Sequence, residues 1–248
     1  MRRTGMMLVP VTDQESLDRV RATVVAAARD ELGLADDGDP VAFMNDFHRR
    51  GLSAVEMNSF RLALIRRIND EADIGRLIWQ AFRDPLTCII GPDVVVQKSA
   101  NLVIHLPEDG NNAPIHRDAP PNSPFEVVVW VPLVDCFGTK GMCILDKNQS
   151  REGMDLLQAS PETPERIENF VWDRFQPIPV PYGSAVMFWA GLLHAVPTNT
   201  EGQTRWSFNI RYKNTFAPYG TKGYPEYFKI LEMSPLTELA YDWQKPKK

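Results

Sequence analysis

The chain has 248 residues, of which 44% are hydrophobic, so it can bury a full core as one large domain or as two small ones. Its net charge of −5 provides no basic surface for nucleic acid or anionic lipid, so we expect neither as a partner, although an acidic chain would tolerate a cationic substrate. The three cysteines lack zinc-site spacing, and any disulfide scheme leaves one of them unpaired, so we expect reduced thiols. No apolar run approaches the length of a membrane span, and we therefore expect a cytoplasmic protein.

The first third of the chain has the pattern of amphipathic helices. Thr12 and Glu15 fit a capping box at the start of one helix, and apolar residues follow them at helical spacing. A second helix is expected across residues 54–68 and a third across 70–82, because each segment carries an apolar stripe. We interpret these stripes as core-facing rather than functional.

Residues 86–214 have the pattern of short β-strands. Gly, Pro, Asn and Asp clusters separate the runs VVVQ, ANLVIHL, FEVVVWVPLV, GMCIL, SAVMFW and RWSFNIRY, which is typical of an all-β sandwich or barrel. An insertion near 150–178 should hold one short helix, and the segment 215–248 should hold a last helix in SPLTELAYDW. We therefore expect a single domain, 1–248, with residues 1–85 as a helical flank on the β core.

The segment NAPIHRDAPP places two good metal ligands two residues apart. On a strand, His116 and Asp118 point to the same side while Arg117 points to the other. Fe(II) bound by two histidines and one carboxylate needs a third ligand from elsewhere in the chain. His105 lies inside a predicted strand, whereas His194 ends a strand beside a loop and is the best candidate. His-x-Asp alone is a weak motif, and most occurrences bind no metal.

Polar side chains occupy one face of the strand RWSFNIRY. Arg205, Ser207, Asn209 and Arg211 alternate with apolar residues. An arginine can clamp a carboxylate with two hydrogen bonds, and Ser207 can add a third. Simple exposure of this face to solvent, as on many antiparallel sheets, explains the pattern equally well.

The order of these features resembles the Fe(II)/2-oxoglutarate-dependent dioxygenases. His-x-Asp is followed by a distal His and, eleven residues later, by Arg-x-Ser. The segments APIHRDAP, FEVVVWVPLVDC, KGMCILDKNQS and YGSAVMFWAGLLHAVPTNTEGQTRWSFNIRY are similar to the phytanoyl-CoA-hydroxylase-like branch, across residues 94–214. In that branch the segment matching KGMCILDKNQS is a Gly-led strand that ends in a short polar turn, so KNQS is expected to be a turn. The chain departs from the branch where KNQS replaces Gly-Ser-His and YGS replaces Pro-Gly-Asp. Some similar proteins are oxygenases of aminoglycoside and other carbohydrate antibiotic clusters.

The resemblance implies a mainly β fold, a double-stranded β-helix (jelly roll) with N-terminal flanking α-helices. It implies that His116, Asp118 and His194 bind Fe(II), and that Arg205 with Ser207 holds the distal carboxylate of 2-oxoglutarate, the co-substrate. Related halogenases lack the carboxylate ligand. Because Asp118 is present here, hydroxylation or another oxidation is expected.

Five further residues are candidates for the walls of this site. Gln97, Asn101 and His105 share parity in the run before the motif, so we expect Gln97 and Asn101 to line the 2-oxoglutarate pocket. His105 fits a neutral core histidine equally well. Arg211 is expected to support the site residues from behind, without direct contact with the ligand. Trp130 either lines the pocket or packs in the core, and we favour the core.

The function expected is oxidation of a polar small molecule with O2, an amino sugar or aminocyclitol of antibiotic biosynthesis being one candidate. A lipid or acyl-CoA hydroxylase is an alternative. A cupin-like metal protein without 2-oxoglutarate would not need Arg205, and a non-catalytic jelly-roll binding module would not need the metal. The sequence carries no prediction of oligomeric state.

Acidic residues in two loops bear on the substrate. Glu108, Asp109, Glu162, Glu165 and Glu168 fall in segments expected near the mouth of the barrel. They favour a cationic substrate over a CoA thioester with its phosphates. Ordinary solvated loops are the plainer explanation.

Overall fold

The computed structural model describes residues 1–35, 38–110, 114–119, 122–159 and 164–244. Its first helices are α1 (Gln14–Glu31), α2 (Pro40–Asn45), α3 (Ala54–Glu71), α4 (Ile74–Ala81) and α5 (Arg83–Ile90), and later come α6 (Lys147–Ala159), α7 (Pro164–Trp172) and α8 (Pro235–Gln244). The helices expected in the first third, in the insertion and near the C-terminus are all present. None of the described helices has the length and apolar content needed to cross a membrane.

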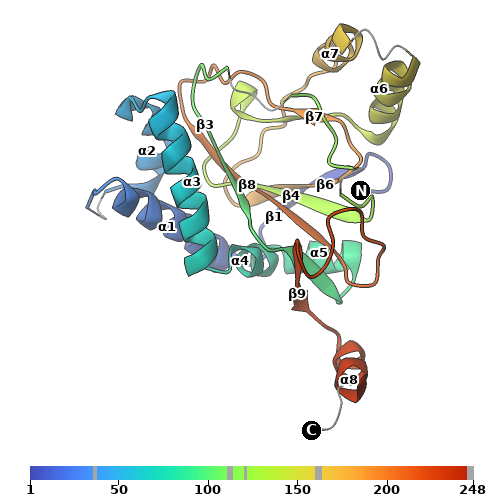
Figure 1. The fold of residues 1–248 in the computed structure, drawn as a ribbon. Helices are drawn as coiled ribbons and strands as arrows, with labels where there is room; N and C mark the ends of the chain where they lie inside the picture. The colour runs from blue at the N-terminus through green and yellow to red at the C-terminus, as the bar shows by residue number, and fades with distance from the viewer. Residues whose placement is uncertain (36–37, 111–113, 120–121, 160–163, 245–248) are drawn as a thin grey trace.

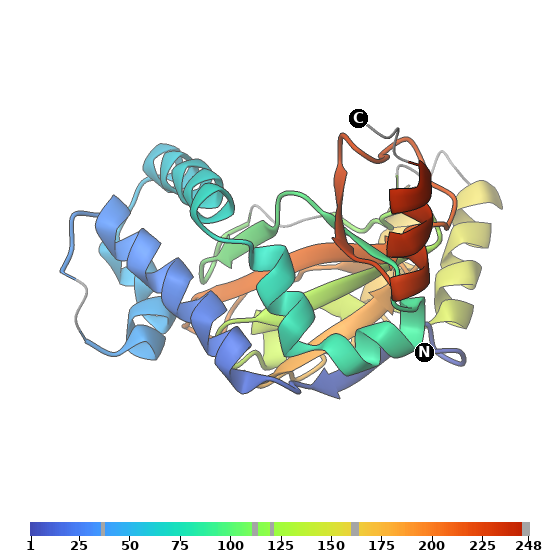
Figure 2. The same ribbon diagram turned by 90° about the horizontal axis from the view of Figure 1, so that it is seen from below.

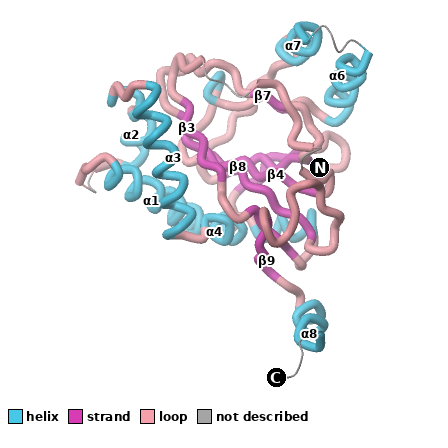
Figure 3. Tube along the Cα trace, in the orientation of Figure 1, coloured by secondary structure: helices cyan, strands magenta, loops and turns pink. Residues whose placement is uncertain are grey.

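The strands form one large antiparallel sheet and one small one (Figures 1 and 3). The large sheet contains β1 (Met6–Pro10), β2 (Val94–Gln97), β3 (Asn101–His105), β4 (Glu126–Pro132), β6 (Ser184–Trp189), β8 (Arg205–Asn214) and β9 (Phe228–Glu232), in the order β1-β6-β4-β8-β2-β9, with β3 also paired to β8. The small sheet pairs β5 (Cys143–Ile144) with β7 (His194–Ala195). The long strand β8 is central, because β4 lies along one edge while β3 and β2 share the other.

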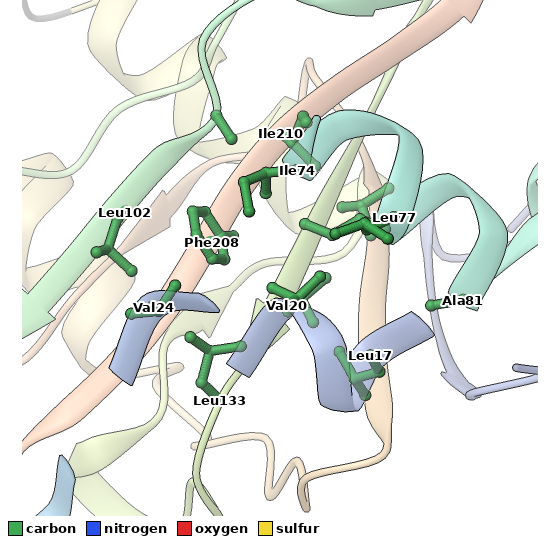
Figure 4. Packing of buried hydrophobic residues seen from close by; sticks show 14 of the residues in the cluster. Leu17, Val20, Val24, Ile74, Leu77, Ala81, Leu102, Leu133, Phe208 and Ile210 are labelled. Atoms are coloured by element: carbon green, nitrogen blue, oxygen red, sulfur yellow. The ribbon is translucent and has the colours of Figure 1, made fainter. Parts of the chain in front are cut away.

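Helices α1, α3 and α4 cover one face of the large sheet (Figures 1 and 2). Figure 4 shows side chains of α1 and α4 meeting those of the sheet: Leu17, Val20, Val24, Ile74 and Leu77 from the helices, Leu102, Phe208 and Ile210 from the strands, and Leu133 just after β4. Full burial of one such side chain contributes about 1.5–3 kcal/mol. Because the even-numbered residues of β8 are committed to this core, the odd-numbered residues must point to the opposite face.

Two smaller clusters lie on that opposite face. Trp130 and Phe188 belong to one of them. In the other, α6 and α7 pack behind β7 and the segment before it, with Leu193 and Ile115 in contact with the cluster. The neighbours of two candidate ligands, His194 and His116, are thus held by apolar packing.

The chain as a whole is mixed α and β rather than mainly β. Helices hold more of the described residues than strands do, because α6 and α8 add to the helical first third. The expectation of a helical start also needs correction, since Met6–Pro10 forms strand β1 on the edge of the sheet, paired with β6. Such short apolar runs do not distinguish strand from helix by periodicity.

The first helix is capped one residue later than expected. Asp13, not Thr12, is the N-cap, and its carboxylate accepts from the backbone N–H of Ser16. The Thr12 hydroxyl instead donates to the carbonyl of Ala81 at 3.0 Å. Aspartate is among the best N-cap residues, so Asp13 caps the helix in place of Thr12, the residue that the T-x-x-E pattern indicated.

The polar turn expected at KNQS is the first turn of α6. Asp146 accepts hydrogen bonds from the backbone N–H groups of Asn148 and Gln149, and the Gln149 side chain accepts from the N–H of Asp146 at 3.1 Å. This reciprocal pair is a D-x-x-Q capping box. It starts a helix where only a turn was expected.

Candidate metal centre

His116, Asp118 and His194 converge on one point. Each offers a ligand atom, and these atoms lie within 4.8 Å of one another. The two histidines face each other across an isolated antiparallel bridge, in which N–H of His194 donates to O of His116 at 2.9 Å and N–H of His116 donates to O of His194 at 3.1 Å. The i, i+2 spacing and the strand-end position therefore place the three residues together, and the group can hold an iron ion.

Backbone carbonyls orient both imidazoles. Nδ1 of His116 lies 2.7 Å from the carbonyl of Pro114, and Nδ1 of His194 lies 3.0 Å from the carbonyl of Leu192. A carbonyl only accepts, so each Nδ1 carries the proton and each Nε2 keeps its lone pair. This is the arrangement in which histidines bind metals through Nε2.

The electrostatics of the group also suit a cation. Burial, with a smaller contribution from the neighbouring His116, lowers the pKa of His194, so this imidazole stays neutral. One carboxylate oxygen of Asp118 forms an ion pair with Arg211, and the other is left for a metal. Nη1 of Arg211 donates to Gln97 at 3.1 Å and to the Tyr227 hydroxyl at 3.3 Å.

The polar face of β8 is buried at Arg205 and Ser207 and half-buried at Asn209 and Arg211, which excludes the solvent-exposed alternative. Arg205 is 2% exposed and Ser207 is fully buried. Arg205 donates to the carbonyl of Gly141 at 3.0 Å but forms no ion pair within the part of the chain that the structure describes. Nε of Arg205 and the hydroxyl of Ser207 have no hydrogen-bond partner among the described residues, and burial lowers the pKa of Arg205 to about 10. A buried cation without a counter-charge is costly, and a bound anion would remove that cost.

The expected wall residues do not all lie on one strand. The run breaks after Gln97, because Asn69 of α3 bonds both the N–H and the carbonyl of Ala100. Gln97 therefore ends β2 and contacts Arg211, whereas Asn101 and His105 belong to β3. Across the β3–β8 ladder, His105 is opposite Arg205 and Asn101 is opposite Asn209.

Trp130 lies beside Arg205, and Arg211 lies beside Asp118. Trp130 is 1% exposed and packs in the cluster with Phe188, as the core interpretation predicted. Its ring also lies 5.9 Å from the guanidinium of Arg205, so it forms one wall beside that cation. Arg211 lies behind Asp118 and supports it.

Two residues around the group were not expected from the sequence. Tyr227, in the C-terminal segment, reaches Arg211, and Arg61 of α3 lines a pocket of about 190 Å³ that also contains Asn101, His105 and Arg205. No local motif marks either residue, since both depend on how distant elements pack.

The acidic loop residues do not form one group. Glu108 is exposed and Asp109 lies beside α3, whereas Glu165 and Glu168 are exposed on α7. Glu162 lies outside the described residues. Asp109 lines a pocket with Val196, two residues after His194, whereas α7 packs in the cluster that contains Ile115 and Leu193.

No protein-family model and no curated protein sequence matches the chain. Among solved structures, the nickel complex of ThoJ, described as a non-heme monooxygenase, matches with a TM-score of 0.58 and 17% identity over 95% of this chain and 83% of that one. The apo form of ThoJ matches with a TM-score of 0.58 and 16% identity over 94% and 82%. The chain has the fold of ThoJ. At this level of identity the likeness shows the fold and not the activity.

Proposed function

We propose that the chain is an Fe(II)- and 2-oxoglutarate-dependent oxygenase that oxidises a polar small molecule with O2. The observation that carries this proposal is a metal-binding group combined with a buried guanidinium, Arg205, that has no carboxylate partner among the described residues. A dicarboxylate that chelates the metal at one end and reaches Arg205 at the other uses both features. ThoJ, whose fold this chain has, is described as a non-heme monooxygenase and holds nickel, which supports a metal-dependent oxidation.

We also propose that the two sheets form a double-stranded β-helix within a single oxygenase domain, 1–248. One hydrophobic core joins α1, α3 and α4 to the large sheet, which supports one domain. Contacts from Arg211 to Asp118 and from Arg205 to Gly141 bridge the polar face of β8 to the segments beside the small sheet.

The residues present fit an iron ion. His116 and His194 would bind it through Nε2, while their Nδ1 protons stay on backbone carbonyls, and Asp118 would bind it through the oxygen that Arg211 leaves unoccupied. Iron held this way supplies O2 activation coupled to decarboxylation of 2-oxoglutarate. Because the carboxylate ligand is in place, we propose hydroxylation or another oxidation rather than halogenation.

The co-substrate would occupy the pocket beside Arg205. Its distal carboxylate would accept from Nε of Arg205 and from the Ser207 hydroxyl, which have no other partners in the part of the chain that the structure describes. Asn101 lines this pocket and stays a proposed wall residue. Gln97 is used differently, since its amide contacts Arg211 and the carbonyl of Ser99. We propose that Gln97 supports the metal group rather than the dicarboxylate.

The rival functions leave specific features without a role. A cupin-like metal protein without 2-oxoglutarate leaves Arg205 buried and unpaired, and a binding module without metal leaves the two oriented imidazoles unexplained. For the substrate we propose an amino sugar or aminocyclitol, as in antibiotic biosynthesis. The exposed Glu165 and Glu168 on α7 support a cation over an acyl-CoA.

An anaerobic titration tests the proposal. Fe(II) and 2-oxoglutarate together should produce a weak visible charge-transfer band, because that band requires both to bind in chelating geometry. His116→Ala should lose iron, and Arg205→Gln should keep iron but lose the band at moderate 2-oxoglutarate concentration. Iron binding without a band at any 2-oxoglutarate concentration would favour the cupin-like function, and absence of iron binding would favour the binding module.

A further inference from the structure

Helix α3 runs beside the free edge of β3 (Figure 1). Two polar side chains of α3 bridge the helix to that edge: Asn69 bonds the backbone of Ala100, and Nη2 of Arg61 donates to the carbonyl of Ile104 at 3.0 Å. Within the described residues, the strand between these bridges has no further strand partner on this side. Its edge is therefore open to solvent or to a ligand.

Two pockets meet along this edge. The inner one, about 190 Å³, is lined by Asn101, His105, Val196 and Arg205 among others. The outer one, about 370 Å³, is lined by the start of α3 and by residues 106–109. Arg61 and Asp109 line both pockets, so they mark the boundary between them. Because they share these two residues, the two pockets are neighbours, and the inner one is lined by Arg205.

Arg61 has spare capacity to bind an anion at this boundary. It forms no ion pair with any residue that the structure describes, and its Nε is buried without a hydrogen-bond partner. Asp109, the opposite charge at the boundary, has an interaction partner of its own. Two guanidinium groups, Arg61 and Arg205, thus line one small pocket without a carboxylate paired to either.

We propose that these two neighbouring pockets together form the entrance for the dicarboxylate co-substrate and that Arg61 is a second recognition residue for it. The inference rests on the proposed function, since it assumes that Arg205 receives a dicarboxylate. Arg61 attracts the distal carboxylate at the boundary and shares it with Arg205 once the molecule is bound. The organic substrate then has no need of this entrance and can approach the metal from another side.

The test compares arginine variants by binding rather than turnover. Succinate and 2-oxoglutarate are titrated into the metal-free protein by calorimetry, and 2-oxoglutarate into the anaerobic iron-loaded protein by the charge-transfer band. Arg61→Gln should lower the binding affinity for both dicarboxylates by about 5- to 30-fold, a range typical of the loss of one partly exposed charge-assisted hydrogen bond. The loss should shrink at high salt, because part of it is attraction at a distance. Arg66→Gln, on the exposed side of the same helix, is the matched control and should bind as the parent does.

Arg61→Lys separates charge from structure, because lysine keeps the positive charge but changes the bond to Ile104. It should retain most of the affinity if charge matters. Two outcomes would overturn the role of Arg61 and leave the proposed function intact. In the first, Arg61→Lys and Arg61→Gln lose dicarboxylate affinity equally. In the second, Arg61→Gln keeps its affinity while Arg205→Gln loses it. Failure of the parent protein to bind any dicarboxylate would instead overturn the proposed function itself.

Discussion

At the scale of single residues, the candidate site depends on charges that are compensated locally. Asp118 and Arg211 form the clearest case, since both side chains are largely buried and each is the ionic partner of the other. The i, i+2 rule on a strand predicted that His116 and Asp118 share a side. It could not predict this ion pair, because that depends on the fold of residues 93 positions apart in the sequence.

Breaking this pair should destabilise the metal-free protein. Removing one partner of a buried ion pair costs about 3–5 kcal/mol, because the other charge stays buried without compensation. Arg211→Met and Asp118→Asn should therefore each lower the free energy of unfolding, measured in urea. The double variant should lose less stability than the sum of the two single losses. Additive losses in this cycle would show that the two side chains do not interact.

Glu126 supports a prediction about pH. Its carboxyl is 2% exposed, accepts from the N–H of Ser123 at 2.7 Å, and has one oxygen without a partner. Burial raises its pKa, which outweighs the opposing attraction of Arg211 and Lys213. As pH rises, the Glu126 carboxyl therefore ionises at a lower pH in the unfolded chain than in the folded protein. The stability that protonated Glu126 contributes is complete below the pKa of the unfolded chain and is lost as pH rises through the pKa of the folded protein.

Glu126→Gln removes that loss while keeping an acceptor for Ser123. The variant should be more stable than the parent in metal-free form at pH 7.5, and the difference should close near pH 4. Urea unfolding at the two pH values measures this, with Glu108→Gln as an exposed control. A variant less stable than the parent at pH 7.5 would show that ionised Glu126 is instead a required partner of Lys213 or Arg211.

At the scale of elements, α6 holds the strand that carries His194. The Ser150 hydroxyl donates to the carbonyl of Leu145 at 3.1 Å and accepts from the N–H of Leu193 at 3.0 Å. A Cβ on Gly153 would lie 2.7 Å from a methyl carbon of Leu193, so glycine permits this close approach. These contacts were hidden in the sequence, because KNQS looked like a turn and Gly153 carries no side chain.

Disturbing this contact should move His194 and weaken metal binding. Ser150→Ala leaves the N–H of Leu193 without its partner, and Gly153→Ala pushes Leu193 away from α6. Each should raise the dissociation constant for Fe(II) or Co(II) by about 10-fold, the lower end for residues that orient metal ligands. Asp155→Ala, exposed on the same helix, should bind metal normally. Unchanged metal affinity in a destabilised Ser150→Ala protein would limit α6 to a structural role.

The strand β8 shows which features of an element the sequence pattern predicts and which it does not. Its alternation correctly predicted a strand with one polar face, and the buried positions of Arg205 and Ser207 decided between the two explanations of that face. The runs VVVQ and ANLVIHL form separate strands as predicted, but the parity that Gln97 shares with Asn101 and His105 does not carry across the break between them. The break at Ala100 depends on Asn69, which reaches it from another helix.

At the scale of the whole molecule, the helical first third and the β-rich remainder were predicted correctly, while the balance between them was not. Helix α6 and strand β1 come from short segments whose local patterns are ambiguous. The pocket boundary at Arg61 arises only when α3 packs on β3. Such features depend on tertiary contacts and have no signature in the local sequence.

The net charge of −5 and the two exposed acidic residues of α7 lead to a prediction about the substrate. Helix α7 exposes Glu165 and Glu168 and packs through Ile167 and Phe170 in the cluster that contains Leu193 and Ile115. A cationic substrate that approaches from this side would be attracted, whereas a CoA thioester would be repelled. Consumption of 2-oxoglutarate should therefore increase on addition of amino sugars or aminocyclitols.

This increase should fall as salt rises from low to physiological concentration, because the Debye length shortens from about 30 Å at 0.01 M to about 8 Å at 0.15 M. The double variant Glu165→Gln/Glu168→Gln should show a weaker response to amino sugars and less salt dependence. Its 2-oxoglutarate affinity should not change, since these residues lie on α7 and not beside the pocket of Arg205. Stimulation by acyl-CoA with no response to any amino sugar would contradict the prediction and favour a lipid hydroxylase.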